Sequence, residues 1–428
     1  MFQTQNIGSV VRSLGVNLIK IIHTADIHLD SPLRSLALRN SGLRDVVAAA
    51  SRSAFSQLVD RSISEKVSAL LISGDLFDGK ERSARTAAFL MAELDRLGDA
   101  GIRVFYIKGN HDAENPITGT LDLPSNVHVF DARGGKEQLT DEVWIHGVSF
   151  ADRHAPDSLL PRFRAPVPDT VNIAMLHSSL GGSVGHDTYA PCSVPDLVGM
   201  GFDYWALGHI HRRQIHSDAP WIIMPGIPQG RDIGEAGPKS ATMIVIDQGR
   251  IDVTEVPTSV VEFAQIEVDV TEAADDEALR GLLKRQLNAL RKRIAAPVGV
   301  IRLALTGRPA RHWQILRDRD VWIEQVNALA EAAGDLWIDK LMFDLLPPAT
   351  DESAGGATDE LAETMAAIPT EPGFAAFARK EVEALLQDLP AALREKISPD
   401  EADRDALIDR LTKAGTDLVL AQMKGAGN

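Results

Sequence analysis

The sequence has a single cysteine among 428 residues and lacks any long apolar run. Cys192 alone cannot form a disulfide within the chain, which fits a reducing cytoplasm and excludes a small disulfide-stabilised scaffold. No stretch approaches the roughly 18 consecutive apolar residues that a membrane span needs, so we expect no membrane association. The first 17 residues carry one cation, Arg12, and no small-residue cleavage site follows an apolar stretch. A secretory signal is therefore not expected, and we predict a cytoplasmic protein.

Positive charge is also scarce. The chain has 44 Lys and Arg against 60 Asp and Glu, a net charge of −16, which is not the electrostatic pattern typical of a nucleic-acid binder. The charge is uneven, however. Residues 351–428 contain 16 acids and 8 bases, whereas residues 271–320 contain 6 acids and 11 bases. We expect a polyanionic ligand to meet this basic middle segment.

Short apolar runs alternate with helical patterns over residues 18–250, which predicts a layered α/β domain. The helical patterns cover residues 43–66 and 81–98. The runs that read as buried strands are Leu18–His23, Ala69–Ser73, Val104–Lys108, Trp144–Val148, Asn172–His177 and Tyr204–Leu207.

The pattern changes near Val260, where a strand, a basic helix and a second strand predict a smaller α+β domain. A stretch rich in Pro, Gly, Ser and Thr then predicts a linker. We predict an N-terminal extension (1–17), an α/β domain (18–258), the smaller domain (259–346), a linker (347–359) and a helical tail (360–428).

The tail predicts two helices. The first has one apolar face, formed by Ala378, Val382, Leu385 and Leu389. For the second, residues 398–401 (SPDE) match a capping box with Ser398 as the N-cap, and Gly415 can end the helix.

Metal-ligand residue types end or follow five of the strand-like runs. The elements, in chain order, are Asp26 with His28; Gly74, Asp75 and Asp78; Gly109, Asn110, His111 and Asp112; His177; and Gly208, His209 and His211. Because the carboxyl ends of the strands share one edge of a layered sheet, we expect these loops to converge. Carboxylates, imidazoles and an amide oxygen suit divalent metals, and two such ions can activate a water and clamp a phosphodiester. The lack of cysteine ligands argues against a structural zinc site.

This ordered set resembles the calcineurin-like metallophosphoesterase superfamily. Residues 23–33 (HTADIHLDSPL), 189–211 and 225–240 (PGIPQGRDIGEAGPKS) look like its DNA repair exonuclease branch, the YhaO-type proteins. These are related to SbcD, the nuclease subunit of SbcCD. The resemblance covers roughly residues 18–350. It implies a four-layer α/β/β/α sandwich with a smaller α+β capping domain and a helical C-terminal tail.

The resemblance also implies a site with two divalent ions, usually Mn²⁺ in this family. One ion would be held by Asp26, His28 and His211, the other by Asn110, His177 and His209, with Asp75 between them. His111 would be the histidine that binds no metal, stabilises the scissile phosphate and assists the leaving oxygen. The positions of these residues in the chain also support a His111 that binds no metal, because the adjacent Asn110 and His111 cannot easily face the same ion.

The implied function is a two-metal phosphodiesterase that acts as a DNA exonuclease in DNA repair, by hydroxide attack on a phosphodiester. Whether it is also an endonuclease stays open. Two alternatives stay open: a scaffold subunit of an ATPase complex, and a phosphodiesterase acting on small nucleotides. The intact ligand set disfavours the first alternative, and the separate basic domain disfavours the second. A protein phosphatase is disfavoured because Gly79 and Lys80 follow Asp78, where that branch has Arg-Gly.

Basic residues of the middle segment are the candidate DNA contacts, although a solvated helix face explains them equally well. The candidates are Lys284, Arg285, Arg291, Lys292 and Arg293, together with Arg231, which could instead pin its own loop. By the resemblance, the tail would dock on a coiled-coil SbcC-like ATPase; the alternative is packing on its own domain. Because the chain has no G-x-x-x-x-G-K-[ST] loop, the ATPase must be another polypeptide. A homodimer is a further partner to consider.

Overall fold

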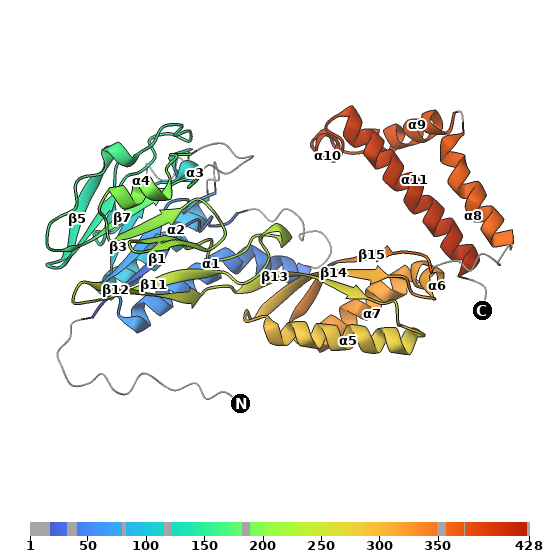
Figure 1. The fold of residues 1–428 in the computed structure, drawn as a ribbon, viewed down its shortest axis with the longest axis horizontal. Helices are drawn as coiled ribbons and strands as arrows, with labels where there is room; N and C mark the ends of the chain where they lie inside the picture. The colour runs from blue at the N-terminus through green and yellow to red at the C-terminus, as the bar shows by residue number, and fades with distance from the viewer. Residues whose placement is uncertain are drawn as a thin grey trace. The chain divides into compact units, whose positions relative to one another are not determined.

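The computed structural model of the chain describes residues 18–31, 41–78, 83–114, 122–181, 189–348, 357–371 and 373–425 (Figure 1). They divide into two compact units, the first within residues 1–264 and 294–300 and the second within residues 265–293 and 301–428. The predicted N-terminal extension and residues 349–356 of the predicted linker lie outside the described residues. Within the described ranges, no helix has the length and apolar character needed to cross a membrane.

Two six-stranded sheets form the first unit. In spatial order, the first sheet contains β12 (Arg250–Pro257), β11 (Ser240–Asp247), β1 (Ile19–Thr24), β2 (Ala69–Ser73), β3 (Arg103–Ile107) and β4 (Val127–Val129). The second contains β5 (Gly135–Thr140), β6 (Val143–Gly147), β7 (Val171–His177), β8 (Tyr204–Gly208), β10 (Trp221–Met224) and β9 (Gln214–Asp218). The central strands β1 to β3 and β6 to β8 pair in parallel, so their carboxyl ends lie at one edge of each sheet.

Alternating side chains explain why the two sheets stack. In β2, Leu71 packs against the other sheet, while Leu70 packs against the helices on the outer face. In β8, Tyr204 likewise faces the inter-sheet core, and Trp205 faces the outer layer. The helices are α1 (Ser41–Glu65) and α2 (Ala84–Asp99) on the first sheet, α4 (Val194–Gly199) on the second, and the short α3 (Asn110–Glu114). The predicted α/β/β/α sandwich is therefore confirmed.

The second unit contains a three-stranded sheet with helices packed on it. Its elements are β13 (Val261–Asp269), α5 (Asp276–Arg293), β14 (Val298–Gly307), α6 (His312–Arg317), α7 (Arg319–Ala332) and β15 (Leu336–Leu345), with β14 central in the sheet. The first residues of β13 and β14 belong to the first unit. In α5, four buried leucines recur at helical spacing: Leu279, Leu283, Leu287 and Leu290. This stripe leaves the basic side chains of α5 on its other faces.

The tail forms helices that pack on each other and on the same unit. They are α8 (Ala357–Ala367), α9 (Phe374–Gln387), α10 (Ala391–Ile397) and α11 (Glu401–Lys424). Val382 of α9 packs against Ile408 of α11, whereas Leu385 of the predicted apolar face is 64% exposed. The end of α11 contacts α6, where Lys424 lies over the Trp313 ring at 5.4 Å. Three of the four residues of the predicted face, all except Leu385, are therefore covered within the tail itself.

Two predicted helix boundaries in the tail are wrong. Ser398 ends α10, and the N-cap of α11 is Asp400, whose carboxylate accepts a hydrogen bond from the Asp403 backbone N–H at 2.9 Å. Gly415 does not end α11. One glycine in a helix interior costs only about 1 kcal/mol, and α11 continues because Leu420 and Ala421 beyond it are buried.

Candidate metal centre

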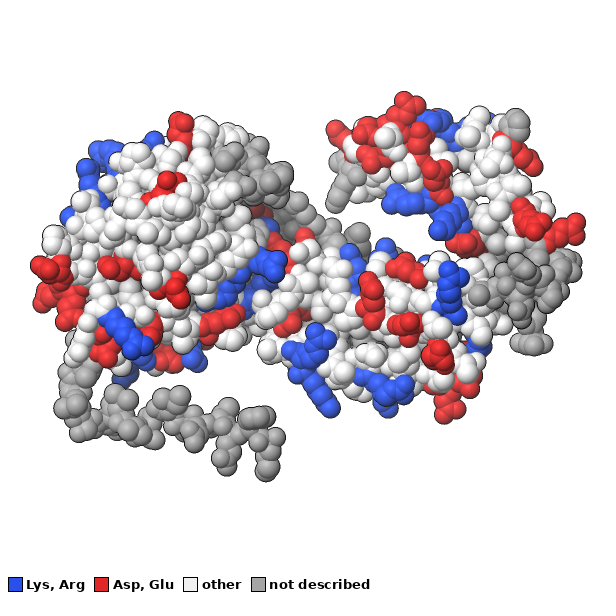
Figure 2. Space-filling view, viewed as in Figure 1, with Lys and Arg blue, Asp and Glu red and all other residues white. Residues whose placement is uncertain are grey.

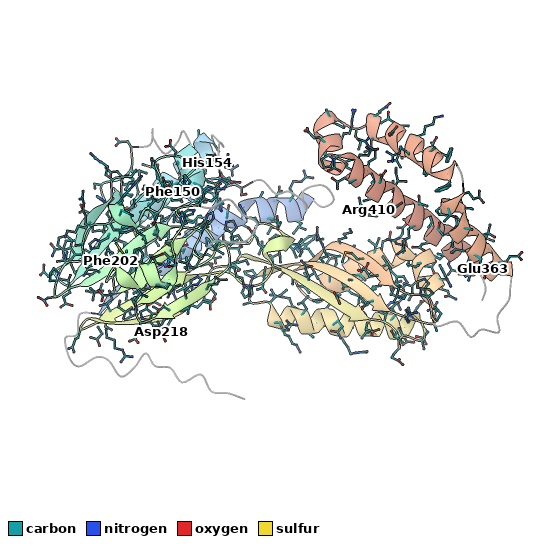
Figure 3. All side chains as sticks on the ribbon, turned by 45° about the horizontal axis from the view of Figure 1, so that its top comes forward. Phe150, His154, Phe202, Asp218, Glu363 and Arg410 are labelled. Carbon is teal, nitrogen blue, oxygen red and sulfur yellow. The ribbon has the colours of Figure 1, made fainter. Side chains whose placement is uncertain are left out.

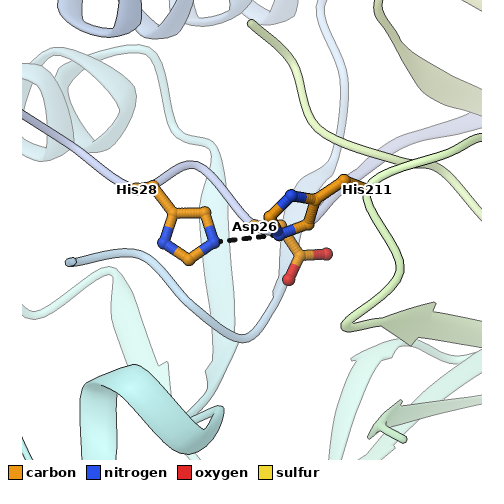
Figure 4. Close-up of side chains that lie close together, drawn as sticks. All are labelled: Asp26, His28 and His211. Carbon is orange, nitrogen blue, oxygen red and sulfur yellow. Dashed lines mark hydrogen bonds between the residues drawn. The ribbon is translucent and has the colours of Figure 1, made fainter. Parts of the chain in front are cut away.

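The first group of ligand side chains joins the loop after β1 to the loop after β8. Suitable atoms of Asp26, His28 and His211 all lie within 4.8 Å of one another (Figure 4). The Nε2 atoms of His28 and His211 are 3.2 Å apart. Two nitrogens that each lie 2.1 Å from one ion, at roughly a right angle, are about 3 Å apart. The spacing therefore fits two ligands of a shared ion.

The second group lies beside it. Atoms of Asp26, Asp75 and His177 also lie within 4.8 Å of one another. Asn110 Oδ1 is 3.1 Å from His177 Nε2, and the His209 ring lies 5.1 Å from the His177 ring, centroid to centroid. The structure thus brings all seven predicted ligands to one edge of the stacked sheets.

Asp75, a member of the second group, also lies near His28 of the first group. Its Oδ1 accepts a hydrogen bond from the His111 backbone N–H at 2.9 Å. Its Oδ2 is 3.4 Å from His177 Nε2 and 4.0 Å from His28 Nε2. One oxygen is therefore engaged by the protein, and the other faces both groups, as a bridging ligand requires.

The loops are held together by their backbones. The N–H groups of Asp26 and His28 donate to the carbonyl oxygens of Gly74 and Asp75, at 2.9 and 3.0 Å. Four of the predicted ligand residues adopt positive φ, which are Asp26 (52°), His28 (45°), Asp75 (51°) and His209 (111°). The flanking Gly208 has no room for a side chain, because a Cβ would lie 2.0 Å from the Ser73 carbonyl oxygen. Close backbone approach explains this glycine.

Burial sets the charge state of the centre. Asp26 and Asp75 are 1% and 2% exposed, and burial raises the pKa of Asp26. Burial lowers the pKa values of His28 and His209 to about 3, so both are neutral, the form of imidazole that binds metal. Two buried carboxylates need nearby positive charge, and divalent ions held by this donor set would supply it. The residues therefore fit the metal ions that the resemblance implies.

His177 is held in one orientation. Its Nδ1 lies 2.9 Å from the Ser73 carbonyl oxygen, to which it donates, so Nε2 faces Asn110. Phe150, labelled in Figure 3, packs edge-on against the His177 ring, with centroids 5.6 Å apart. Burial opposes a charge on His177, but Asp75 raises its pKa to about 9. Binding a metal through Nε2 would therefore displace a proton.

His111 differs from the seven predicted ligands. Its side chain is 35% exposed, and its Nδ1 lies 3.3 Å from Asp78 Oδ1. The hydrogen bond with Asp78 raises the pKa of His111. Atoms of His28, Asp78 and His111 also lie within 4.8 Å of one another. His111 is thus a half-exposed, hydrogen-bonded imidazole at the rim of the centre.

Sequence reasoning gave no role to three carboxylates around the centre. Asp78 contacts His111, as above. Asp112 accepts hydrogen bonds from the backbone N–H groups of Phe77 and Gly109, each at 3.0 Å, and so ties two ligand loops together. Glu235 Oε1 lies 2.7 Å from His211 Nδ1. Asp78 and Asp112 belong to two recognisable sequence patterns, Gly74-Asp75-x-x-Asp78 and Gly109-Asn110-His111-Asp112. No local pattern indicates Glu235.

The predicted DNA contacts divide between the two units. Arg231, in the first unit, is paired with Glu235 at 2.7 Å. The others lie on α5 in the second unit, where blue side chains project in Figure 2. Lys284, Arg285, Lys292 and Arg293 are exposed, whereas Arg291 is half-buried and has a partner.

The stacked sheets and the histidine–carboxylate centre define a metallophosphoesterase, a metal-dependent hydrolase of phosphate esters. Residues 19–213 match the family model of the calcineurin-like phosphoesterases, and residues 263–345 match that of the metallophosphoesterase YhaO middle domain. The metallophosphoesterase YhaO of Bacillus subtilis (strain 168) is 34% identical over 319 residues, which cover 73% of this chain and 78% of that protein. The chain belongs to this YhaO-type metallophosphoesterase family, and the resemblance seen in the sequence is confirmed.

More distant relatives are similar to this chain over about half of its length. The DNA double-strand break repair protein Mre11 of Sulfurisphaera tokodaii is 28% identical over 203 residues, 46% of this chain and 50% of that protein. The Mre11 protein of Saccharolobus solfataricus is 28% identical over 222 residues, 49% of this chain and 55% of that protein. The chain thus spans about half the length of these Mre11 relatives.

Proposed function

We propose that this protein is a two-metal phosphodiesterase that acts as a DNA exonuclease in DNA repair, with Mn²⁺ as its metal. The observation that carries the proposal is the convergence of seven candidate ligand side chains, five of them buried, with the half-exposed His111 beside them. The similarity to Mre11 proteins, which are named for DNA double-strand break repair, supports DNA as the substrate. In this proposal, residues 18–258 form the nuclease domain, 259–346 a capping domain and 360–428 a docking tail.

The proposed roles follow from the contacts. One ion would be held by Asp26, His28 and His211, the other by Asn110, His177 and His209, with Asp75 shared. When bound, two divalent ions supply Lewis acidity toward the phosphate and lower the pKa of water.

His111 completes the arrangement as a general acid. Its Nδ1 faces Asp78, so its Nε2 is the atom that can carry a proton to the leaving oxygen. The Asp75 carboxylate also fixes the backbone N–H of His111, which keeps this imidazole at the rim of the metal centre.

Purified protein stripped with EDTA tests the proposal on two substrates, end-labelled DNA and bis-p-nitrophenyl phosphate. We expect no activity without metal, the highest activity with Mn²⁺, and shortening of DNA from its ends. Hydrolysis of the small ester without any DNA cleavage would favour the small-nucleotide alternative. Inactivity on both substrates, in protein that binds Mn²⁺, would favour the scaffold alternative.

Charge reversal on α5 is expected to weaken DNA cleavage selectively. Replacing Arg285, Lys292 and Arg293 by glutamate removes exposed positive charge; Arg291 is left intact because it is half-buried and has a partner. Each lost phosphate contact should flatten the slope of log affinity against log salt by about 0.9. DNA binding between 50 and 200 mM salt measures the slope, and hydrolysis of bis-p-nitrophenyl phosphate should not change.

A matched control reverses three exposed cations on the tail, Lys380, Arg410 and Lys413. It should leave the salt slope of DNA binding unchanged. An equal loss on DNA and on the small ester in the α5 variant would mean that α5 is structural. An unchanged salt slope would exclude α5 as a DNA contact.

The proposed partner is a coiled-coil SbcC-like ATPase that binds the tail. The exposed Leu411 and Leu418 of α11, 47% and 54% accessible, are seven residues apart and share one face of the helix. Glutamate at both positions is expected to abolish co-purification with the ATPase, because an apolar helix face is what a helix-in-groove contact buries. Point substitutions are preferable to deleting the tail, because α11 covers part of α6.

The control for this experiment is Val198→Glu, at an exposed apolar residue of α4 in the first unit. It should retain the ATPase, and all variants should hydrolyse bis-p-nitrophenyl phosphate at the wild-type rate. Retention of the ATPase by the α11 variant would place the partner surface elsewhere.

A further inference from the structure

A half-buried carboxylate contacts one of the proposed metal-ligand histidines. Glu235 ends a short 3₁₀ helix, Ile233–Glu235, and its side chain is only 15% exposed. Its Oε1 lies 2.7 Å from His211 Nδ1. Its Oε2 accepts a hydrogen bond from the Arg231 backbone N–H at 2.8 Å. Both oxygens accept hydrogen bonds from Arg231, and Oε1 alone also contacts the histidine.

This contact determines which nitrogen of His211 carries the proton. A carboxylate can only accept, so Nδ1 must donate to Glu235. In the neutral ring, Nε2 is then left with its lone pair, and Nε2 faces His28 Nε2 at 3.2 Å, where an ion would bind. The Arg231 Nη2 also lies 3.1 Å from His211 Nδ1, but that guanidinium donates to the same Glu235 oxygen at 2.7 Å.

We propose that Glu235 is a positioning residue of the metal centre, which fixes the tautomer and ring orientation of His211 for metal binding. The inference rests on the metal site of the proposed function. Outer carboxylates that accept from a ligand histidine typically contribute 10- to 100-fold in metal affinity. Glu235 follows His211 by 24 positions, and the loop that carries it brings it back to the centre.

A purely structural role is the competing explanation. Glu235 forms several hydrogen bonds with Arg231 within its own loop, and a Cβ at Gly230 would lie 2.9 Å from the Glu235 carbonyl oxygen. The loop is therefore built closely around Glu235. The test must separate an effect that passes through His211 from a general loosening of this loop.

Calorimetric titration of EDTA-stripped full-length protein with MnCl₂ distinguishes positioning of His211 from general support of the loop. Wild type is expected to bind two ions. Glu235→Gln keeps the shape of the side chain but removes its charge. It should weaken the binding of one ion about 10- to 100-fold, while the other ion binds with nearly its wild-type affinity. His211→Ala should weaken the binding of the same ion. The double variant should bind this ion no more weakly than His211→Ala does alone.

Two further variants complete the experiment. Glu255→Gln removes a carboxylate that also pairs with an arginine, Arg213 at 3.8 Å, and should leave both ions unchanged. Arg231→Ala loosens the loop without removing the carboxylate and should have a much smaller effect than Glu235→Gln. Melting temperatures measured in EDTA should be alike for the variants.

Three results would overturn the role of Glu235. These are a Glu235→Gln affinity within twofold of wild type, losses that add fully to those of His211→Ala, and an Arg231→Ala loss as large as that of Glu235→Gln. A wild-type protein that binds no Mn²⁺ would instead overturn the metal centre itself. Failure of the inference and failure of the proposed function are thus distinguished.

Discussion

Replacing Asp75 by alanine is expected to abolish metal-dependent phosphodiesterase activity. Asp75 is 2% exposed, and its Oδ2 faces both ligand groups at 3.4 and 4.0 Å. Its loss would leave both ions with fewer ligands, so the metal content should fall together with the rate. The measurements are hydrolysis of bis-p-nitrophenyl phosphate at saturating Mn²⁺ and elemental analysis after dialysis. We expect less than about a tenth of wild-type activity, because two-ion catalysis needs both ions in place.

The control is Asp157→Ala, at an exposed acid of the same unit. It should retain both the rate and the two ions. If Asp75→Ala keeps more than about a tenth of the activity at saturating Mn²⁺, Asp75 does not bridge the two ions.

His111→Gln is expected to separate chemistry from metal binding. Loss of a general acid typically costs 10²- to 10⁴-fold in rate, about 3–5 kcal/mol. The loss should be larger on DNA than on bis-p-nitrophenyl phosphate, because p-nitrophenolate leaves readily without a proton, whereas a sugar oxygen does not. Metal content should stay near two ions per chain, since His111 faces Asp78 and is not among the seven proposed ligands.

His128→Gln is a closely matched control. His128 has a side-chain exposure of 36% against 35% for His111, and it too lies near a carboxylate, with Glu137 at 3.9 Å. It should leave both substrates and the metal content unaffected. A loss of metal in His111→Gln parallel to its loss of rate would make His111 a ligand, as its place beside His28 and Asp78 would allow.

The central strands could be predicted because they are short, apolar and followed by polar loops. β2 spans the predicted Ala69–Ser73, and β7 begins one residue before the predicted Asn172. The outer antiparallel strands could not be predicted in this way. β9 (Gln214–Asp218) is polar and largely exposed at a sheet edge. Its extended conformation comes from pairing with β10 and is not predicted by its own sequence.

The ligand loops were predictable for a related reason. Each predicted metal ligand ends or follows a recognisable strand, so topology alone brings Asp26 and His211 to one edge. The supporting carboxylates are harder to find. Glu235 is one of 60 acids, and only the return of its loop places it 2.7 Å from His211. Contacts of this kind depend on loop geometry, which hydrophobic periodicity does not specify.

The left-handed backbone at Asp26, His28 and Asp75 restricts which residues these positions can accept. Among residues other than glycine, Asn, Asp and His are those most enriched in this conformation. The same three side chains also donate oxygen or nitrogen to a metal. An exchange of aspartate for asparagine at Asp26 or Asp75 therefore changes the charge of the centre by one while the loop keeps its path. Metal preference at this centre can thus be altered by substitutions among Asn, Asp and His, the three residues that this backbone conformation favours.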